Sequence, residues 1–374
     1  MADNIYVTKS FLPPIKEYEE YLKQIFDNCI LTNQGKLLMQ LEKKITSFLN
    51  VKNFQYVTNG TLALQLALDS LNIKNGEIIT TPFTYVATTT SILWERCEPV
   101  FVDIEPDNFT LDPAKIEKAI TPRTKAILPV HVFGYACDVE AIQKIADKHE
   151  LKVIYDGAHA FAARYKGRSL LDFGDITTCS FHATKLFHTV EGGGCVVKND
   201  IVNYRLNLAK CFGHDNDAYF QVGINAKQSE FHAAMGLANF GHLGEILEKR
   251  RIISETYDSL LNDVVGRPKK QNDLEYNYAY YPVVFKNEEE LLSVFEALNA
   301  EGIFPRRYFY PSLNKLSYVK GDFSCPISED IASRIACLPL YPDLALHDVE
   351  RICLIIRNVI GKRAFNYGVS LKSV

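Results

Sequence analysis

Apolar residues follow two alternating patterns along the first half of the chain. Short runs rich in β-branched and aromatic residues alternate with longer segments in which apolar residues recur every three or four positions. Such short runs predict buried strands, and the longer spacing predicts helices that cover them. The seven predicted strands are FQYVT (54–58), EIITTP (77–82), PVFVDI (99–104), KAILPVH (125–131), KVIYDGAH (152–159), ITTCSFHA (176–183) and GCVVK (194–198). The alternation predicts an α/β fold in which a seven-stranded, mostly parallel sheet is sandwiched by helices.

Helical spacing also extends on both sides of this region. It is found at residues 15–28, 37–50, 62–71, 139–150, 240–259 and 288–302. The first two of these helices are expected to form an N-terminal arm packed on the main domain. Near the C-terminus, the run YAYYPVVF (278–285) predicts a strand between helices, which favours a smaller α+β domain. We therefore expect a large domain over residues 1–250 and a small domain over residues 251–374.

Composition narrows the classes of function. The chain has 374 residues, of which 47% are hydrophobic, enough for a large core. Its 41 basic and 45 acidic residues are spread along the chain, so neither nucleic acid nor a membrane surface is expected as a partner. The nine cysteines include no CxxC pair, so no metal site and no disulfide are expected. The sequence has no signal-like segment and no run that could span a bilayer, which predicts a cytoplasmic protein.

One lysine stands in an unusual setting. In SFHATKLFHTVEGGG (180–194), Lys185 follows a predicted strand and precedes three glycines. An isolated lysine in a polar loop is usually solvated. However, loops at the edge of an open α/β sheet gather ligands, and glycines let a backbone approach closely. A lysine amine in such a site can form a Schiff base, which suggests pyridoxal phosphate as a cofactor.

Pyridoxal phosphate needs a phosphate cradle, an acid and a flat residue, and the chain offers a candidate for each. Gly60 and Thr61 open a predicted helix whose free N–H groups favour an anion, although Thr61 alone would be a simple N-cap. Asp156 ends an apolar strand, where a charged carboxylate needs a partner such as a protonated ring nitrogen. His159 could reach the phenolic oxygen of the ring or merely satisfy a buried backbone group. Tyr85 could stack on the ring or be an ordinary core aromatic.

The order of these motifs is more specific than any one of them. The phosphate loop NGTLAL, the aromatic in TPFTYVATTTS, the acid in DGAHAF and the lysine follow one another along one predicted sheet. Together with PVHVFGYACD, GINAKQSEFHAAMG and RRYFYPSL, they resemble the DegT/StrS family of nucleotide-sugar aminotransferases. This resemblance covers nearly the whole chain and implies a pyridoxal phosphate enzyme of fold type I.

The resemblance implies three catalytic residues. Lys185 matches the lysine that binds the cofactor and moves the proton, and Asp156 matches the acid that keeps the pyridinium nitrogen protonated. His159 matches the residue beside the ring hydroxyl. Dehydratases of the same family replace the lysine with histidine, so the intact Lys185 favours amino transfer over dehydration.

Further residues match the cofactor site of the family. Gly60, Thr61 and Ser180 match the phosphate cradle, and Tyr85 matches the stacking aromatic. Asn225 matches a residue that reaches the phosphate from the neighbouring subunit, which implies a homodimer with shared active sites. The family often has an arginine two residues after this asparagine, whereas a lysine stands here. That second contact is therefore less specific, because lysine lacks the planar fork of arginine.

The implied reaction transfers an amino group from glutamate to a nucleotide-linked keto sugar. The motifs GINAK and RRYFYPSL resemble the branch that acts on dTDP-linked keto-6-deoxyhexoses. The implied substrate is dTDP-4-keto-6-deoxy-D-glucose, and the product is dTDP-4-amino-4,6-dideoxyglucose. Such a product would feed a surface polysaccharide, such as the O-antigen of lipopolysaccharide, or a glycosylated natural product. The candidate substrate contacts are Arg306, Arg307, Tyr308, His131 and His188.

Four alternatives stay open or are weighed against this interpretation. The amine could be added at carbon three of the sugar instead of carbon four. The chain could also be a sugar dehydratase of the family, or a sensor that keeps the cofactor without chemistry. A dinucleotide loop at glycines 192–194 is disfavoured, because they lack the GxGxxG spacing and precede a strand, not a helix.

Overall fold

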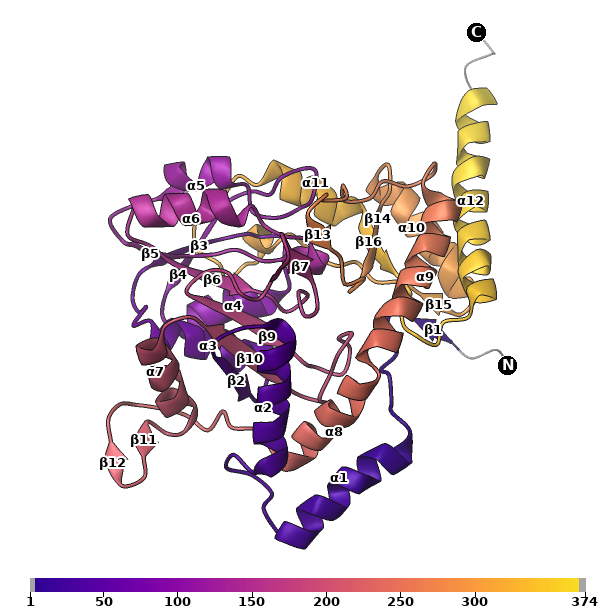
Figure 1. The fold of residues 1–374 in the computed structure, drawn as a ribbon. Coiled ribbons are helices and arrows are strands. Elements are labelled where there is room, and N and C mark those ends of the chain that lie inside the picture. The colour runs from indigo at the N-terminus through magenta and orange to yellow at the C-terminus, as the bar shows by residue number, and fades with distance from the viewer. Residues whose placement is uncertain (1–3, 370–374) are drawn as a thin grey trace.

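The computed structural model describes residues 4–369 and the side chains of residues 4–361. A seven-stranded sheet forms the centre of the molecule (Figure 1). In spatial order its strands are β2 (Phe54–Val57), β10 (Gly193–Val197), β9 (Ile176–Ser180), β6 (Lys152–Asp156), β5 (Thr124–Leu128), β3 (Glu77–Thr80) and β4 (Glu98–Phe101). Only β10 runs antiparallel to its neighbours within this sheet, so the predicted mostly parallel sheet is confirmed.

Helices cover both faces of the sheet, because successive side chains of each strand point to opposite faces. Ile78 and Ile154 pack toward α3 (Gly60–Ser70), α4 (Val86–Trp94) and α7 (Asp200–Lys210). Their neighbours Ile79 and Val153 pack on the other face against α5 (Pro113–Ala119) and α6 (Val139–Lys148). On that face, α2 (Lys36–Leu49) and α8 (Glu230–Gly241) continue the layer.

Most predicted strands end earlier than the apolar runs suggested. The segments DGAH and SFHA leave the sheet after Asp156 and Ser180, where β6 and β9 end. They leave it as loops held by bonds between neighbouring strands, such as the N–H of Gly157 donating to the carbonyl of Thr178 at 2.8 Å. Asp156 and Ser180 are therefore the last residues of their strands, and His159 and Lys185 lie on the loops that follow.

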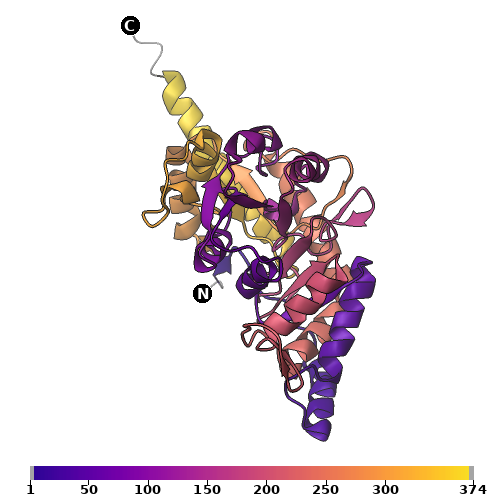
Figure 2. The same ribbon diagram turned by 90° about the vertical axis from the view of Figure 1, so that its left-hand side faces the viewer.

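The N-terminal arm has two attachments. Helix α1 (Ile15–Asn28) and α2 lie along α8, as Figures 1 and 2 show. Strand β1 (Ile5–Tyr6) instead pairs in parallel with β15 (Ile303–Phe304), far along the chain. The arm was expected to pack on the main domain; this strand contacts the C-terminal part as well, because Ile5 is buried in the hydrophobic cluster of that part.

The C-terminal part has a core of its own. Strand β14 (Tyr281–Val284) pairs antiparallel with β16 (Ile335–Leu338). Around them pack α9 (Leu243–Leu261), α10 (Glu288–Ala300) and α12 (Leu346–Val369), while α11 (Pro326–Arg334) precedes β16. The predicted domain boundary at residue 250 falls inside α9, so a continuous helix joins the two parts. The division into two domains stays a prediction.

Short elements complete the described chain. They are β7 (Arg164–Tyr165), β8 (Arg168–Ser169), β11 (His214–Asp215), β12 (Ala218–Tyr219), β13 (Leu274–Glu275), and the 3₁₀ turns η1 (Val132–Gly134) and η2 (Leu313–Lys315). The single helix predicted over residues 240–259 is divided at His242 into α8 and α9. Glycines at 241 and 244 flank the break, and glycine is a poor helix former.

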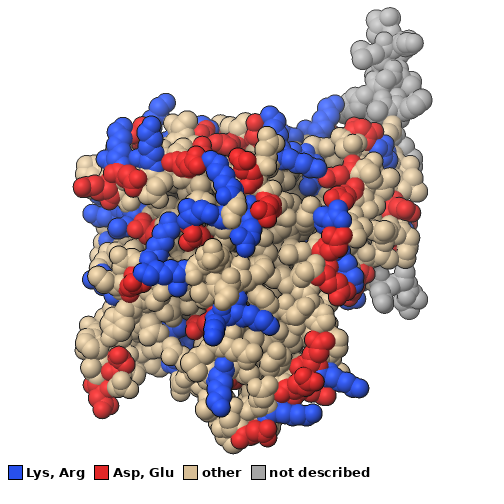
Figure 3. Space-filling view, in the orientation of Figure 1, with Lys and Arg blue, Asp and Glu red and all other residues tan. Residues whose placement is uncertain are grey.

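The surface carries both signs of charge. On the face drawn in Figure 3, basic and acidic side chains are interspersed, in keeping with the net charge of −4. Within residues 4–369, no helix combines the length and the apolar character that crossing a bilayer would need.

A distant glutamate caps α2. Gly35 at the N-cap offers no side chain, and the carboxylate of Glu230 accepts bonds from the N–H groups of Leu37 and Leu38, both at 2.8 Å. Glu230 is fully buried, and a Cβ on Gly35 would lie 2.7 Å from its Oε2 atom. The carboxylate of Glu230 therefore holds α2 in place by binding the positive N-terminal end of that helix.

We expect Glu230→Ala to destabilise the protein by about 2 kcal/mol, because two helical N–H groups lose a charged acceptor. In a protein of this size the melting temperature should fall by about 4 °C, measured by circular dichroism. The matched control is Glu296→Ala, which removes an exposed carboxylate from α10. Equal melting temperatures for the two variants would contradict the capping role.

Candidate active site

A pocket of about 440 Å³ opens where the chain leaves the parallel strands. Its lining begins with residues that follow β2, β3, β5, β6 and β9, and it is closed by a segment from the C-terminal part. Ligands of open α/β sheets bind at this edge. The predicted residues that line it are Gly60, Thr61, Tyr85, Asp156, His159, Ser180, Lys185, Arg306 and Tyr308.

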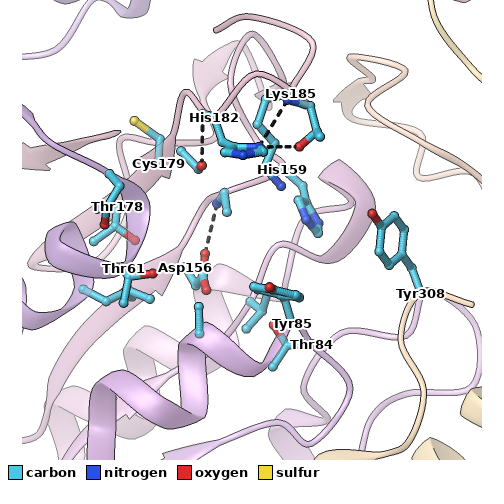
Figure 4. A pocket seen from close by; sticks show the side chains of 18 of the residues that line it. Thr61, Thr84, Tyr85, Asp156, His159, Thr178, Cys179, His182, Lys185 and Tyr308 are labelled. Carbon is cyan, nitrogen blue, oxygen red and sulfur yellow. Dashed lines mark hydrogen bonds between the residues drawn. The ribbon is translucent and has the colours of Figure 1, made fainter. Parts of the chain in front are cut away.

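Lys185 and Asp156 bring opposite charges into the pocket (Figure 4). Desolvation lowers the pKa of Lys185 to about 8, and the nearby carboxylate of Asp156 partly offsets it. Desolvation also raises the pKa of Asp156, against hydrogen bonds and the charge of Lys185 that lower it. Both groups are therefore less solvated than surface residues, and each favours an opposite charge beside it.

A chain of hydroxyl groups holds the Asp156 carboxylate. Thr88 donates to Oδ2 at 2.7 Å, and the N–H of Ala158 donates to Oδ1 at 3.0 Å. The hydrogen of the Thr88 hydroxyl is committed to this bond, so Thr84, whose oxygen lies 3.0 Å away, must donate to Thr88. Thr88 and Thr84 are buried at the start of α4 and just before it. The carboxylate is thus fixed in direction before any ligand binds.

His159 is a neutral imidazole with one nitrogen already engaged. Its Nδ1 atom accepts a bond from the N–H of Phe133 at 3.0 Å, so Nε2 carries the proton. Burial and the charge of Lys185 hold the pKa of His159 well below its usual value. Its ring is parallel to that of Phe309. The histidine can therefore offer one N–H donor to a ligand in the pocket.

The start of α3 forms an anion cradle. The N-cap is Asn59, whose side chain accepts from Leu62, so the simple cap considered for Thr61 is not what the structure has. The first N–H groups of a helix have no partner within it, which leaves those of Gly60 and Thr61 directed at the pocket. A Cβ on Gly60 would lie 3.0 Å from the Cβ of Ser180, so the turn and the end of β9 are in close contact.

The triple glycine serves this cradle without lining the pocket. A Cβ on Gly193 would lie 2.5 Å from the carbonyl carbon of Asn59. Only glycine permits β10 to pass so close to the N-cap. Gly193 therefore lets β10 pack directly against the cradle.

The mouth of the pocket is polar and aromatic. Tyr85 and Tyr308 lie on it, as Figure 4 shows, and the guanidinium of Arg306 lies 5.1 Å from the ring centroid of Tyr308. His182 and Glu191 face each other with 3.5 Å between Nε2 and Oε1. These groups can bind a substrate that carries hydroxyl and anionic groups.

Four predicted residues lie outside the pocket lining. Arg307 is bound to Glu288 and to the carbonyl of Ser333, at 2.6 and 2.7 Å, and stacks on a tyrosine. His131 is fully buried against Tyr155, and burial lowers its pKa to about 3.

The other two also have contacts away from the pocket lining. His188 is buried and binds the carbonyl of Phe11 at 2.7 Å. Asn225 is exposed and forms a β-bridge with Cys211. Tertiary contacts that no local pattern shows thus withdraw both histidines and Arg307 from the pocket of this chain.

Sequence reasoning missed two groups of the site. Thr88 is one of several threonines in TPFTYVATTTS, and only its place on the first turn of α4 singles it out. Tyr280, which accepts a bond from the Lys185 amine at 3.1 Å, lies 95 residues later. The unusual density of tyrosine in YNYAYY was the one available signal.

Comparison with known protein families shows to which family the chain belongs. Residues 14–357 match the DegT/DnrJ/EryC1/StrS aminotransferase family. The chain belongs to this family. It is therefore a sugar aminotransferase, and the enzymes of this family depend on pyridoxal phosphate.

Individual relatives span nearly all of the chain. The dTDP-4-amino-4,6-dideoxy-D-glucose transaminase of Shigella dysenteriae is 39% identical over 369 residues, which cover 96% of this chain and 100% of the relative. The GDP-perosamine synthase of Escherichia coli O157:H7 is 32% identical over 345 residues, or 90% and 93%. The solved structure of DesI in the presence of its TDP-sugar product has a TM-score of 0.92 and 29% identity, and covers 99% of this chain and 96% of its own.

The pocket fits pyridoxal phosphate on chemical grounds. The α3 cradle offers N–H groups to a phosphate, and Asp156 is a buried carboxylate that lacks a cation directly bound to it among the described residues. A protonated pyridine nitrogen would be such a cation. The amine of Lys185 lines the same pocket and would provide the nucleophile.

We expect Thr88→Val to raise the pKa of Asp156 further, because the charged carboxylate loses a donor. The dissociation constant of pyridoxal phosphate, measured by absorbance titration of the cofactor-free protein, should rise about tenfold. The loss should be greatest at acidic pH and recover as the pH rises and Asp156 ionises.

The matched control for this prediction is Thr89→Val. The Thr89 hydroxyl is buried with no hydrogen-bond partner among the described residues, so its removal should leave cofactor affinity unchanged. If both valine variants bound the cofactor as the wild type does, Thr88 would not support Asp156.

Proposed function

We propose that the protein transfers an amino group from glutamate to dTDP-4-keto-6-deoxy-D-glucose, giving dTDP-4-amino-4,6-dideoxyglucose. The observation that carries the proposal is that Lys185 and Asp156 bring an amine and a carboxylate into one pocket beside an anion cradle. The names of the Shigella relative and of the DesI structure support a dTDP-linked sugar. The GDP-perosamine synthase is less similar in sequence to this chain than the Shigella relative. Because its name refers to a different nucleotide, the identity of the base is the first point to test.

In this proposal each residue of the pocket contacts a different part of the cofactor. Gly60, Thr61 and Ser180 would hold the phosphate, and Asp156 would hold the protonated ring nitrogen. The cofactor supplies an electron sink that makes a proton on the amino-bearing carbon removable. His159 would offer its Nε2–H to the ring oxygen, and Tyr85 would stack on the ring.

Lys185 moves the proton. Because its pKa is lowered to about 8, about a tenth of the amine is neutral at pH 7, far more than for an ordinary lysine, and this fraction can accept a proton. The same amine would return the proton to a neighbouring carbon. One water is consumed as glutamate becomes 2-oxoglutarate, and one is released as the amino group replaces the keto oxygen of the sugar.

Arg306 and Tyr308 are the proposed sugar-nucleotide contacts. Arg306 is exposed at the mouth of the pocket and can pair with the diphosphate through its planar guanidinium. Arg307 is not carried into this proposal, because its guanidinium is already bound to Glu288. His131 and His188 are left out because each is buried away from the pocket.

A homodimer with shared active sites is part of the proposal. Asn225 is exposed and follows the β11–β12 hairpin, near which Tyr219, Phe220 and Val222 are 78%, 60% and 88% exposed. Apolar groups exposed together favour a protein partner. A second copy of this chain, with Asn225 reaching its phosphate cradle, would cover them.

The first test follows the absorption of the protein through both half-reactions. We expect pyridoxal phosphate to form a yellow band, glutamate to bleach it, and dTDP-4-keto-6-deoxyglucose to restore it. Lys185→Ala should form no such band, because it lacks the amine that binds the cofactor covalently. Nuclear magnetic resonance of the product should place the amine on carbon four.

Other outcomes identify the alternatives. An amine on carbon three would indicate the 3-aminotransferase. A band that glutamate does not bleach would favour a dehydratase or a sensor. The same keto sugar linked to GDP or UDP should have a kcat/KM at least about tenfold lower, since the base contributes binding energy.

Subunit sharing is tested with hybrid dimers. Lys185→Ala and Asn225→Ala are each expected to be weakly active at limiting cofactor. When the two are co-expressed and paired, activity should return, because each hybrid dimer then contains one site with both residues intact. No recovery in isolated hybrids would mean that Lys185 and Asn225 do not come from different subunits.

A further inference from the structure

The amine of Lys185 has one hydrogen-bond partner among the described side chains. Its Nζ atom lies 3.1 Å from the phenolic oxygen of Tyr280. Tyr280 is 7% exposed, lines the pocket, and its oxygen makes no other hydrogen bond within the described part of the chain. Because burial raises the pKa of Tyr280 well above its ordinary value, the phenol is neutral and accepts the bond from the amine.

The backbone that carries Tyr280 is fixed without help from Lys185. Asn277 donates from Nδ2 to the carbonyls of His159 and Phe161, both at 2.8 Å. The buried guanidinium of Arg250 donates to the carbonyls of Tyr278 and Ala279, at 2.9 and 2.6 Å. These bonds join the segment to the loop that follows Asp156 and to α9.

Aromatic contacts fix the ring of Tyr280 in turn. It meets the ring of His159 with 4.7 Å between centroids, and it stands edge-on to Tyr308 at 5.7 Å. The ring of Tyr280 thus packs between the rings of His159 and Tyr308. Its oxygen is a rigid acceptor at the end of a well-packed side chain.

We propose that Tyr280 is a positioning residue that holds the amine of Lys185 while that amine is free to exchange protons. The proposal rests on the proposed function, in which Lys185 moves the proton. A lysine side chain has four rotatable bonds and loses considerable conformational entropy when its amine is held in one place. A fixed acceptor restricts the side chain before the reaction begins, so less entropy is lost during the reaction, and it keeps the amine near the reacting carbons.

The bond also favours the ammonium form of Lys185, because an acceptor stabilises the charged donor. The titratable groups that face the amine from other elements are Tyr85, Asp156, His159, Arg306 and Tyr308. None of them changes in the experiment below. A shift in the titration of Lys185 would therefore report on the bond to Tyr280.

The experiment compares Tyr280→Phe with Tyr278→Phe in the full-length protein carrying pyridoxamine phosphate. Both variants remove one phenolic oxygen from the same segment, but only Tyr280 contacts Lys185. Trace acetic anhydride labels free amines, and mass spectrometry of the Lys185 peptide across pH gives the titration of this amine. Single-turnover absorbance with the keto sugar gives the rate of proton transfer.

For Tyr280→Phe, we expect the labelling midpoint of Lys185 to fall about one pH unit and the single-turnover rate to fall about tenfold or more. Tyr278→Phe should match the wild type in both measurements. Unchanged labelling and rate in Tyr280→Phe would overturn the proposal. Equal losses in the two variants would also overturn it, since the effect would then belong to the segment and not to the bond.

The wild type separates this inference from the proposed function. If the wild type forms no cofactor band that depends on Lys185, the proposed function fails and the inference fails with it. If the band forms, bleaches with glutamate and returns with the keto sugar, only the behaviour of Tyr280→Phe decides the inference.

Discussion

The carboxylate of Asp156 and the amine of Lys185 are both drawn away from bulk water into one pocket, and removing charged groups from water costs several kcal/mol each. The protein offsets this cost with fixed donors and acceptors: Thr88 and the N–H of Ala158 for the carboxylate, and Tyr280 for the amine. Both groups keep shifted pKa values even so. A cationic ring nitrogen against the carboxylate would complete the set of partners that the pocket offers.

The topology of the sheet brings these groups together. Asp156 ends β6, and the loop that carries Lys185 follows β9, which is the neighbouring strand. The cradle follows β2, and β10 separates β2 from β9 in the sheet. Since β10 runs antiparallel, its glycine start lies at the same edge as the ends of its neighbours, where Gly193 packs on Asn59. Close approach at this glycine lets cradle and lysine share one pocket.

The C-terminal part completes the pocket from the opposite side. The segment of Tyr280 is joined to the loop after Asp156 through the bonds of Asn277. The segment of Arg306 and Tyr308 is joined to β16 by two bonds between the backbones of Arg306 and Cys337. Asp103, which follows β4, makes a further connection to the C-terminal part. Its carboxylate accepts hydrogen bonds from the N–H groups of Ile327 and Ser328 at the start of α11. The groups at the mouth of the pocket are therefore held in place by contacts between distant parts of the chain.

The sequence by itself determined the strands of the sheet, their alternation with helices, and the candidate cofactor residues at or just after strand ends, such as Asp156 and Lys185. These features depend on periodicity and on which residue ends a strand, and both are local properties. Only the tertiary structure decided that Thr88 and Tyr280 reach those residues. It also decided that Arg307 is occupied by Glu288 and that His131 is buried beside Tyr155. Such contacts join residues that are distant in sequence, and they follow from how strands and helices pack, which no local pattern encodes.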